Sequence, residues 1–151
     1  MLPRRILVPT DFSPYSEAAL DYAVELAKSV GASILLLHVF RPPALDLPED
    51  MIVGIADATG RILESAERTL ASSVEVYRSS NVPIETLIEH GVPWRTIVDA
   101  AAKLDAPMIV MGTHGRSGVM HALMGSVAEK VVRTATCPVL AIPRARVEVA
   151  A

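Results

Sequence analysis

The sequence predicts an α/β protein built on an open parallel sheet of five strands, with helices on both faces, in a Rossmann-like arrangement. Short uninterrupted apolar runs alternate along the chain with longer segments whose apolar residues recur every three or four positions. This alternation is typical of βαβ units, and continuous apolar runs are typical of strands buried on both faces. The 151 residues fit a single domain, residues 1–151, with a largely aliphatic core because only 4% are aromatic.

The first forty residues predict one right-handed βαβ unit. Residues 5–9 (RILVP) form the first expected strand. Ser13 followed by Pro14 predicts a capped helix start, and Gly31 fits the C-terminal stop of the same helix. Residues 33–40 (SILLLHVF) then form a second buried strand.

The segment from residue 41 to about residue 60 is the least regular part of the chain. Its three prolines exclude a regular helix at its start, so residues 51–58 are expected to form a helical turn or a mobile flap. A long helix should follow and run to about residue 80. Residues 83–90 alternate apolar and polar side chains, which predicts a third strand near a sheet edge.

The last part of the chain predicts two more helices and two more strands. Residues 94–104 carry apolar residues at helical spacing, and residues 108–111 (MIVM) form an uninterrupted buried strand. A fourth helix is expected over residues 127–136. Residues 138–142 (PVLAI) complete the sheet as a fifth strand.

A glycine-rich loop joins the fourth expected strand to the fourth expected helix. Its spacing is G-x2-G-x9-G-[ST], filled by Gly112, Gly115, Gly125 and Ser126. Glycines allow the backbone to approach a ligand closely, and exposed N–H groups at a helix start attract anions. Ser126 with Glu129 also predicts a capping box. The loop therefore indicates phosphate binding, although it fits neither a Walker A loop nor a dinucleotide-binding fingerprint.

This spacing resembles the signature of the universal stress protein family, in its ATP-binding branch. The segment RILVPTDFSPYSEAAL resembles the first strand and helix of the family, and CPVLAIP resembles its terminal strand. The segment HGVPWRTIVDAAAKLDAPMIVMGTHGRSG resembles its third helix and fourth strand. The resemblance implies the strand order 3-2-1-4-5, in which the loops after strands one and four meet at the switch point of the sheet.

The resemblance also implies which residues bind the nucleotide. The residues expected beside the adenine and the ribose are Pro9, Thr10, Asp11, Val39, Met111 and Gly112. Val39 would meet the adenine edge through its backbone. The residues expected at or near the phosphates are His114, Gly115, Arg116, Gly125, Ser126 and Val127.

The implied ligand is ATP, accompanied by Mg²⁺ held mainly through the phosphates. The leading hypothesis is a regulatory stress-response protein in which the nucleotide is a switch ligand. One alternative is a slow ATPase or self-phosphorylating enzyme, for which Asp11 is the only carboxylate that the sequence nominates. Another is a nucleotide-free interaction protein whose glycine loop is structural. No catalytic constellation and no protein metal site are recognised in the sequence.

The composition of the chain and the expected edge of its sheet indicate where the protein is located and what it binds. Seventeen acidic and fourteen basic residues give a net charge of −3, which disfavours a nucleic-acid binder. No apolar run is long enough to span a membrane and no signal-peptide pattern is present, so a cytoplasmic location is expected.

The fifth strand would lie at a sheet edge, which predicts a homodimer, as the resemblance also implies. The downstream protein partner is not identified by the sequence.

Overall fold

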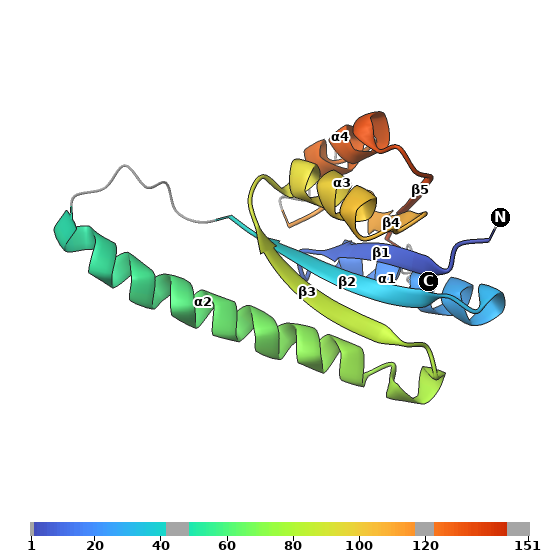
Figure 1. The fold of residues 1–151 in the computed structure, drawn as a ribbon, viewed down its shortest axis with the longest axis horizontal. Helices are drawn as coiled ribbons and strands as arrows, with labels where there is room; N and C mark the ends of the chain where they lie inside the picture. Colours follow the sequence, from blue (N-terminus) through green and yellow to red (C-terminus); the bar gives the residue numbers. More distant parts are fainter. Residues whose placement is uncertain (1, 42–48, 117–122, 145–151) are drawn as a thin grey trace, which may run out of the picture.

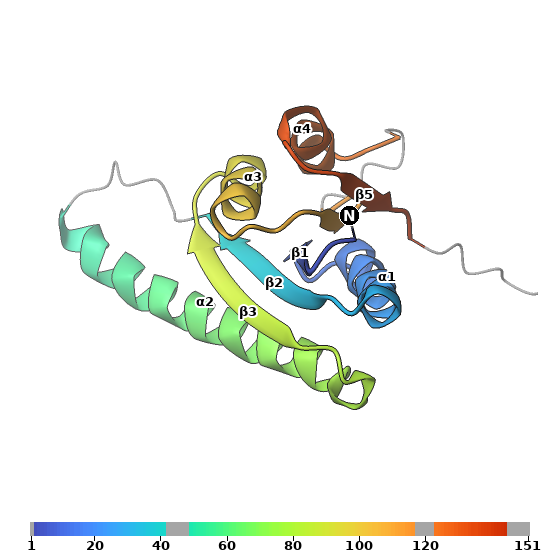
Figure 2. The ribbon, with the colours of Figure 1, turned by 45° about the vertical axis from the view of Figure 1, so that its right-hand side comes forward.

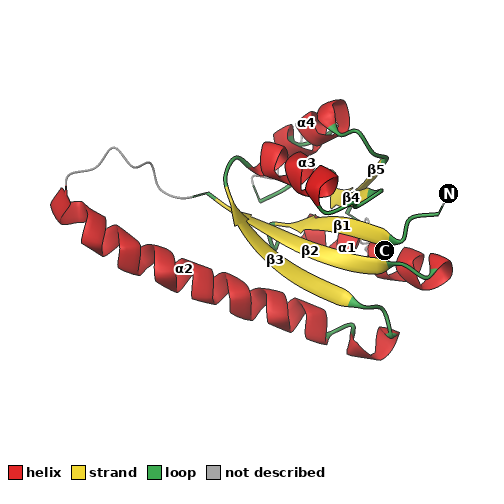
Figure 3. Ribbon diagram, viewed as in Figure 1, coloured by secondary structure: helices red, strands yellow, loops and turns green. Residues whose placement is uncertain are grey.

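A twisted parallel sheet forms the centre of the structure (Figures 1 and 3). The computed structural model describes residues 2–41, 49–116 and 123–144. The strands of this part of the chain are β1 (Arg5–Thr10), β2 (Ser33–Phe40), β3 (Ile84–His90), β4 (Ile109–Gly112) and β5 (Val139–Ile142). They pair in parallel in the order β3-β2-β1-β4-β5. The α/β class predicted from the sequence and the strand order implied by the family resemblance are therefore confirmed.

Helices cover both faces of the sheet (Figure 2). They are α1 (Pro14–Val30), α2 (Glu49–Glu75), α3 (Pro93–Lys103) and α4 (Ser126–Thr134). Side chains along β2 alternate between the two faces. Ile34 and Leu36 enter the core formed with α1 and α2, whereas Leu35 and Leu37 enter the core formed with α3 and α4. This alternation explains the uninterrupted apolar run that predicted the strand.

The boundaries of α1 follow from its terminal residues, as predicted. The Ser13 side chain accepts a hydrogen bond from the backbone N–H of Ser16, and Pro14 occupies the first helical position. Gly31 ends the helix in the left-handed conformation, with φ at 71°. The capped N-terminus of α1 therefore lies close after the carboxyl end of β1, next to the loops expected to bind the ligand.

The prediction for the start of α2 is wrong, because the helix begins at Glu49 and not near residue 60. Helical spacing of apolar residues reaches back to Ile55, and the helix accommodates Gly54 and Gly60 despite the poor helix propensity of glycine. The prolines at positions 42, 43 and 48 lie outside the described residues. Figure 1 shows that the first part of α2 extends beyond the sheet. Among the described residues, no helix has the combined length and apolarity needed to cross a membrane.

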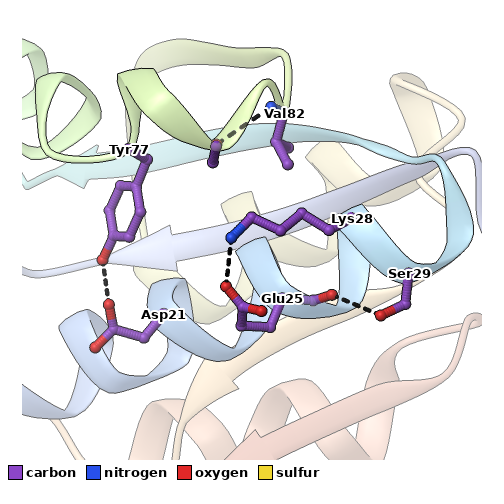
Figure 4. A network of polar contacts seen from close by, with 7 residues as sticks. Asp21, Glu25, Lys28, Ser29, Tyr77 and Val82 are labelled. Carbon is purple, nitrogen blue, oxygen red and sulfur yellow. Dashed lines mark hydrogen bonds and ion pairs between the residues drawn. The ribbon is translucent and has the colours of Figure 1, made fainter.

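The C-terminal end of α2 is tied to α1 by a polar contact (Figure 4). The helix ends at Glu75, earlier than predicted, and a short 3-10 turn follows over Arg78–Ser80. In between, the Tyr77 hydroxyl donates a hydrogen bond to the Asp21 carboxylate of α1. Burial, with the hydrogen bond and charge of Asp21, raises the pKa of Tyr77 above its ordinary value. The contact therefore joins the turn that follows α2 to α1, beside the core packing of Leu70 and Val74.

Candidate functional site

A cavity of about 350 Å³ lies at the carboxyl ends of the strands, where the strand order reverses between β1 and β4. Its volume falls in the range of small-molecule sites, and its position is where open α/β sheets bind ligands. The structure brings together at this cavity all twelve residues predicted from the sequence. These are Pro9, Thr10, Asp11, Val39, Met111, Gly112, His114, Gly115, Arg116, Gly125, Ser126 and Val127.

The remaining wall of the cavity consists of residues that sequence reasoning missed: Ser16, Leu37, Pro93, Ile97 and Ala128. Most of them are apolar, and Leu37, Ile97 and Ala128 belong to the core between the sheet and helices α3 and α4. None of them belongs to a recognisable motif. Leu37 could have been predicted from the sequence: side chains alternate between the two faces of a strand, so Leu37 lies on the same face of β2 as Val39.

Close contact between β4 and α1 explains why glycine occupies position 112. A Cβ atom built on Gly112 would lie 2.8 Å from the carbonyl carbon of Tyr15 and 2.9 Å from its carbonyl oxygen. Real Cβ atoms do not approach backbone atoms this closely. Glycine at this position therefore allows the first turn of α1 to cross the end of β4 and brings the two loops of the site together.

The Asp11 carboxylate connects these two loops. Its Oδ1 accepts a hydrogen bond from the backbone N–H of Ser13 at 3.0 Å, and its Oδ2 accepts one from the backbone N–H of Arg116 at 2.9 Å. The Arg116 Nε donates in return to the Asp11 carbonyl oxygen at 2.7 Å. A Cβ atom on Gly115 would lie 2.6 Å from Asp11 Oδ2. Asp11 and the glycine loop therefore form two walls of one cavity.

The first turn of α4 opens on the cavity, but its cap differs from the prediction. Gly125 is the N-cap residue, Ser126 is the first helical residue, and no side chain caps the helix. The capping-box prediction for Ser126 and Glu129 is therefore wrong. The reason lies in the loop, where the Gly125 N–H donates to the Thr113 carbonyl oxygen at 2.6 Å and so sets Gly125 at the cap position.

This arrangement leaves the start of α4 suited to an anion. The first N–H groups of a helix have no intrahelical acceptor, and the helix dipole makes that end electropositive. Ser126, Val127 and Ala128, which carry these groups in α4, all line the cavity. The cavity therefore combines backbone donors and a serine hydroxyl with the nearby Arg116 guanidinium.

The backbone of β2 directs an acceptor toward the same cavity. The Phe40 carbonyl oxygen accepts from the Gly91 N–H on the β3 side. Because backbone groups alternate in direction along a strand, the Val39 carbonyl points toward the β1 side. There β1 ends at Thr10, and the Phe12 N–H, which is next along the ladder, donates to the Thr10 hydroxyl at 3.1 Å. The Val39 carbonyl therefore faces space that β1 does not fill.

His114 is held within the glycine loop. Its Nδ1 lies 3.0 Å from the Thr113 hydroxyl oxygen, and its ring lies 5.3 Å from the ring of Tyr15, measured between centroids. Within residues 2–41, 49–116 and 123–144, no three His, Cys, Asp or Glu side chains are grouped as metal ligands. Gly118 and His121 of the same loop lie outside the described residues.

Comparison with known proteins identifies the family. The model of the universal stress protein family matches residues 3–143. Universal stress protein MJ0531 of Methanocaldococcus jannaschii is 34% identical over 149 residues, which cover 97% of this chain and 86% of that protein. The fold of universal stress protein UspA from Lactobacillus plantarum superposes with a TM-score of 0.83 at 27% identity, covering 91% of this chain and 96% of that one.

A third relative was solved with a nucleotide. The universal stress protein from Archaeoglobus fulgidus in complex with dAMP has a TM-score of 0.65 and 26% identity, covering 94% of this chain and 99% of that chain. The family match, the strand order and the cavity at the switch point agree with one another. This chain belongs to the universal stress protein family.

Proposed function

We propose that this protein binds ATP in the cavity between β1 and β4 and uses the nucleotide as a switch ligand in a stress response. The proposal rests on one observation: the N-terminus of α4 and the glycine loop both line the same cavity, at the switch point of the sheet. Backbone N–H groups in this arrangement suit phosphate oxygens. Asp11 and Arg116 already connect the two loops, so a ligand between them can favour one arrangement of both.

The apolar wall of the cavity supports an adenine base as the other part of the ligand. Val39 offers a partly exposed apolar side chain to a flat ring, with the buried Leu37 and Ile97 behind it. The Val39 carbonyl is a hydrogen-bond acceptor, which suits the exocyclic amine of adenine and disfavours the 6-oxo group of guanine. The dAMP bound to the Archaeoglobus fulgidus protein is also an adenine nucleotide. Adenine is therefore the base that the site favours.

The phosphate-binding part of the site comprises Gly115, Arg116, Gly125, Ser126 and Val127. A Cβ atom on Gly125 would lie 3.3 Å from the Thr113 carbonyl oxygen and 3.3 Å from the His114 Cα, so glycine keeps this part of the loop closely packed. Arg116 can add a planar cation beside the phosphates. An accompanying Mg²⁺ would be held mainly through phosphate oxygens and water.

The direct test is to identify what the purified protein binds. We expect an adenine nucleotide to be released on denaturation, or ATP to raise the melting temperature more than GTP does. Ligand at one hundred times its Kd should add about 2.7 kcal/mol to the free energy of unfolding. Protein that carries no nucleotide and shows no shift with ATP would support the nucleotide-free interaction protein. Phosphate release above background, lost in Asp11→Ala, would instead support the slow ATPase.

We further propose that the protein forms a homodimer through β5. In the described structure β5 is the last strand of the sheet and all four of its residues are partly exposed. The Ile142 carbonyl oxygen accepts from the Thr113 N–H on the β4 side, so the backbone groups of Ala141 point outward. An edge with outward N–H and C=O groups can pair with its own copy about a two-fold axis.

Sedimentation velocity at micromolar concentration tests this edge. We expect a dimer, and we expect Ala141→Pro to weaken it by about tenfold or more because proline removes an outward N–H donor. The ladder between β5 and β4 does not use that donor, so the fold should remain. Ala141→Val keeps the N–H group and serves as the matched control. A purely monomeric unmodified protein would refute the dimer.

A further inference from the structure

The loop between β1 and α1 contains a backbone conformation that needs an explanation. Phe12 has a φ of 61°, in the left-handed region that bulky residues seldom adopt. Such conformations persist only when the surrounding structure holds them, and they concentrate at functional sites. Phe12 directly follows Asp11, whose carboxylate connects this loop to the glycine loop.

Two contacts hold Phe12 in this conformation, and a third joins its two partners, His38 and Thr10. Its N–H donates to the Thr10 hydroxyl at 3.1 Å, and its ring stacks on the His38 ring with centroids 4.5 Å apart and planes inclined by 25°. The His38 Nδ1 lies 2.9 Å from the Thr10 carbonyl oxygen. Because a carbonyl oxygen only accepts hydrogen bonds, Nδ1 must carry the proton. His38 therefore contacts both residues that flank Asp11.

His38 lies on the other side of the sheet from the apolar wall of the cavity. Its neighbours Leu37 and Val39 line the cavity, and His38 does not. Phe12 packs against the core formed with α1 and α2, again on the side away from Ile97 and helix α3. His38 therefore contacts the loop from the opposite face of the sheet and does not line the cavity.

The turn at Phe12 determines where the Asp11 carboxylate points. With Phe12 left-handed, the Ser13 N–H reaches Asp11 Oδ1, and Oδ2 is directed across the cavity to the Arg116 N–H. We propose that His38 is a positioning residue of the nucleotide site, which holds this turn and thereby the Asp11 wall. This inference rests on the proposed ATP site for its effect on affinity, but the loop geometry can be measured without any nucleotide.

The test replaces His38 in three ways. His38→Ala removes both contacts, His38→Phe keeps a ring without the donor, and His38→Asn keeps an N–H donor close to the position of Nδ1. His90→Asn, which changes an exposed histidine at the end of the neighbouring strand β3, is the control. Each variant is measured for its ATP Kd by calorimetry, for its melting temperature and for amide hydrogen exchange at Arg116.

We expect His38→Ala to raise the ATP Kd about tenfold, the effect of losing one net hydrogen bond, and to speed amide exchange at Arg116. His38→Asn should keep the ATP Kd within about threefold of the unmodified value, since it retains the donor. His38→Phe should resemble the alanine variant in both measurements. The His90→Asn control should change neither.

Three results separate this inference from the proposed function. If the unmodified protein binds no adenine nucleotide, the proposed function fails, and exchange at Arg116 still decides whether His38 positions the loop. Unchanged exchange at Arg116 in His38→Ala would overturn the positioning role. Faster exchange there, combined with an unchanged ATP Kd, would overturn the link between His38 and the nucleotide site.

Discussion

Replacing Gly112 with alanine is expected to destabilise the protein by about 3 kcal/mol, at the upper end of the cost of overpacking. The added Cβ would lie 2.8 Å from the Tyr15 carbonyl carbon and 2.9 Å from the Tyr15 carbonyl oxygen. Both atoms belong to the backbone of the first turn of α1, so no side-chain rotation can relieve the contact. Urea denaturation followed by circular dichroism gives the difference in free energy of unfolding.

Gly60→Ala is the matched control for this substitution. A Cβ at Gly60, in the exposed part of α2, would have no atom within 4 Å. Alanine there should stabilise the protein by about 0.5–1 kcal/mol, because glycine is a poor helix residue. A Gly112→Ala protein as stable as the unmodified one would show that β4 and α1 do not approach each other as closely as described.

The sequence contained enough information for the sheet and for the residues of the cavity. Parallel strands present their carboxyl ends at one edge, so the segment after β1 and the glycine loop after β4 had to lie on the same side. Short-range patterns predicted the strands and helices themselves. The family resemblance, carried partly by the spacing of Gly112, Gly115 and Gly125, implied that β1 and β4 are neighbours and which residues line the cavity.

The features that escaped prediction depend on contacts between distant segments. The Arg116 N–H that binds Asp11 lies 105 residues further along the chain. The cap of α4 is Gly125 because its N–H reaches back to Thr113 across the loop, and no local pattern indicates that bond. The apolar wall at Ile97 likewise depends on how α3 packs against the sheet. A pattern of residue types does not indicate which residues far apart in the sequence will be in contact.

Gly115→Ala is the substitution expected to affect nucleotide binding most. We expect the ATP Kd to rise about thirtyfold, which corresponds to about 2 kcal/mol of binding free energy. A Cβ at this position would lie 2.6 Å from Asp11 Oδ2, so the carboxylate must move away from the Arg116 N–H. In the proposed site, the same Cβ would also occupy space beside the phosphates. Stability should fall by only about 1 kcal/mol, the worth of the lost hydrogen bond.

A double-mutant cycle with Asp11→Ala separates these two effects of Gly115→Ala. If the destabilisation comes from the contact with the Asp11 carboxylate, adding Gly115→Ala to Asp11→Ala should cost little further stability, so the two changes will not be additive. Additive losses of stability would mean that the two residues do not meet. The ATP Kd of the double variant should stay well above that of Asp11→Ala alone, because the Cβ would remain beside the proposed phosphate site. An ATP Kd unchanged by Gly115→Ala in either background would remove the glycine loop from the site.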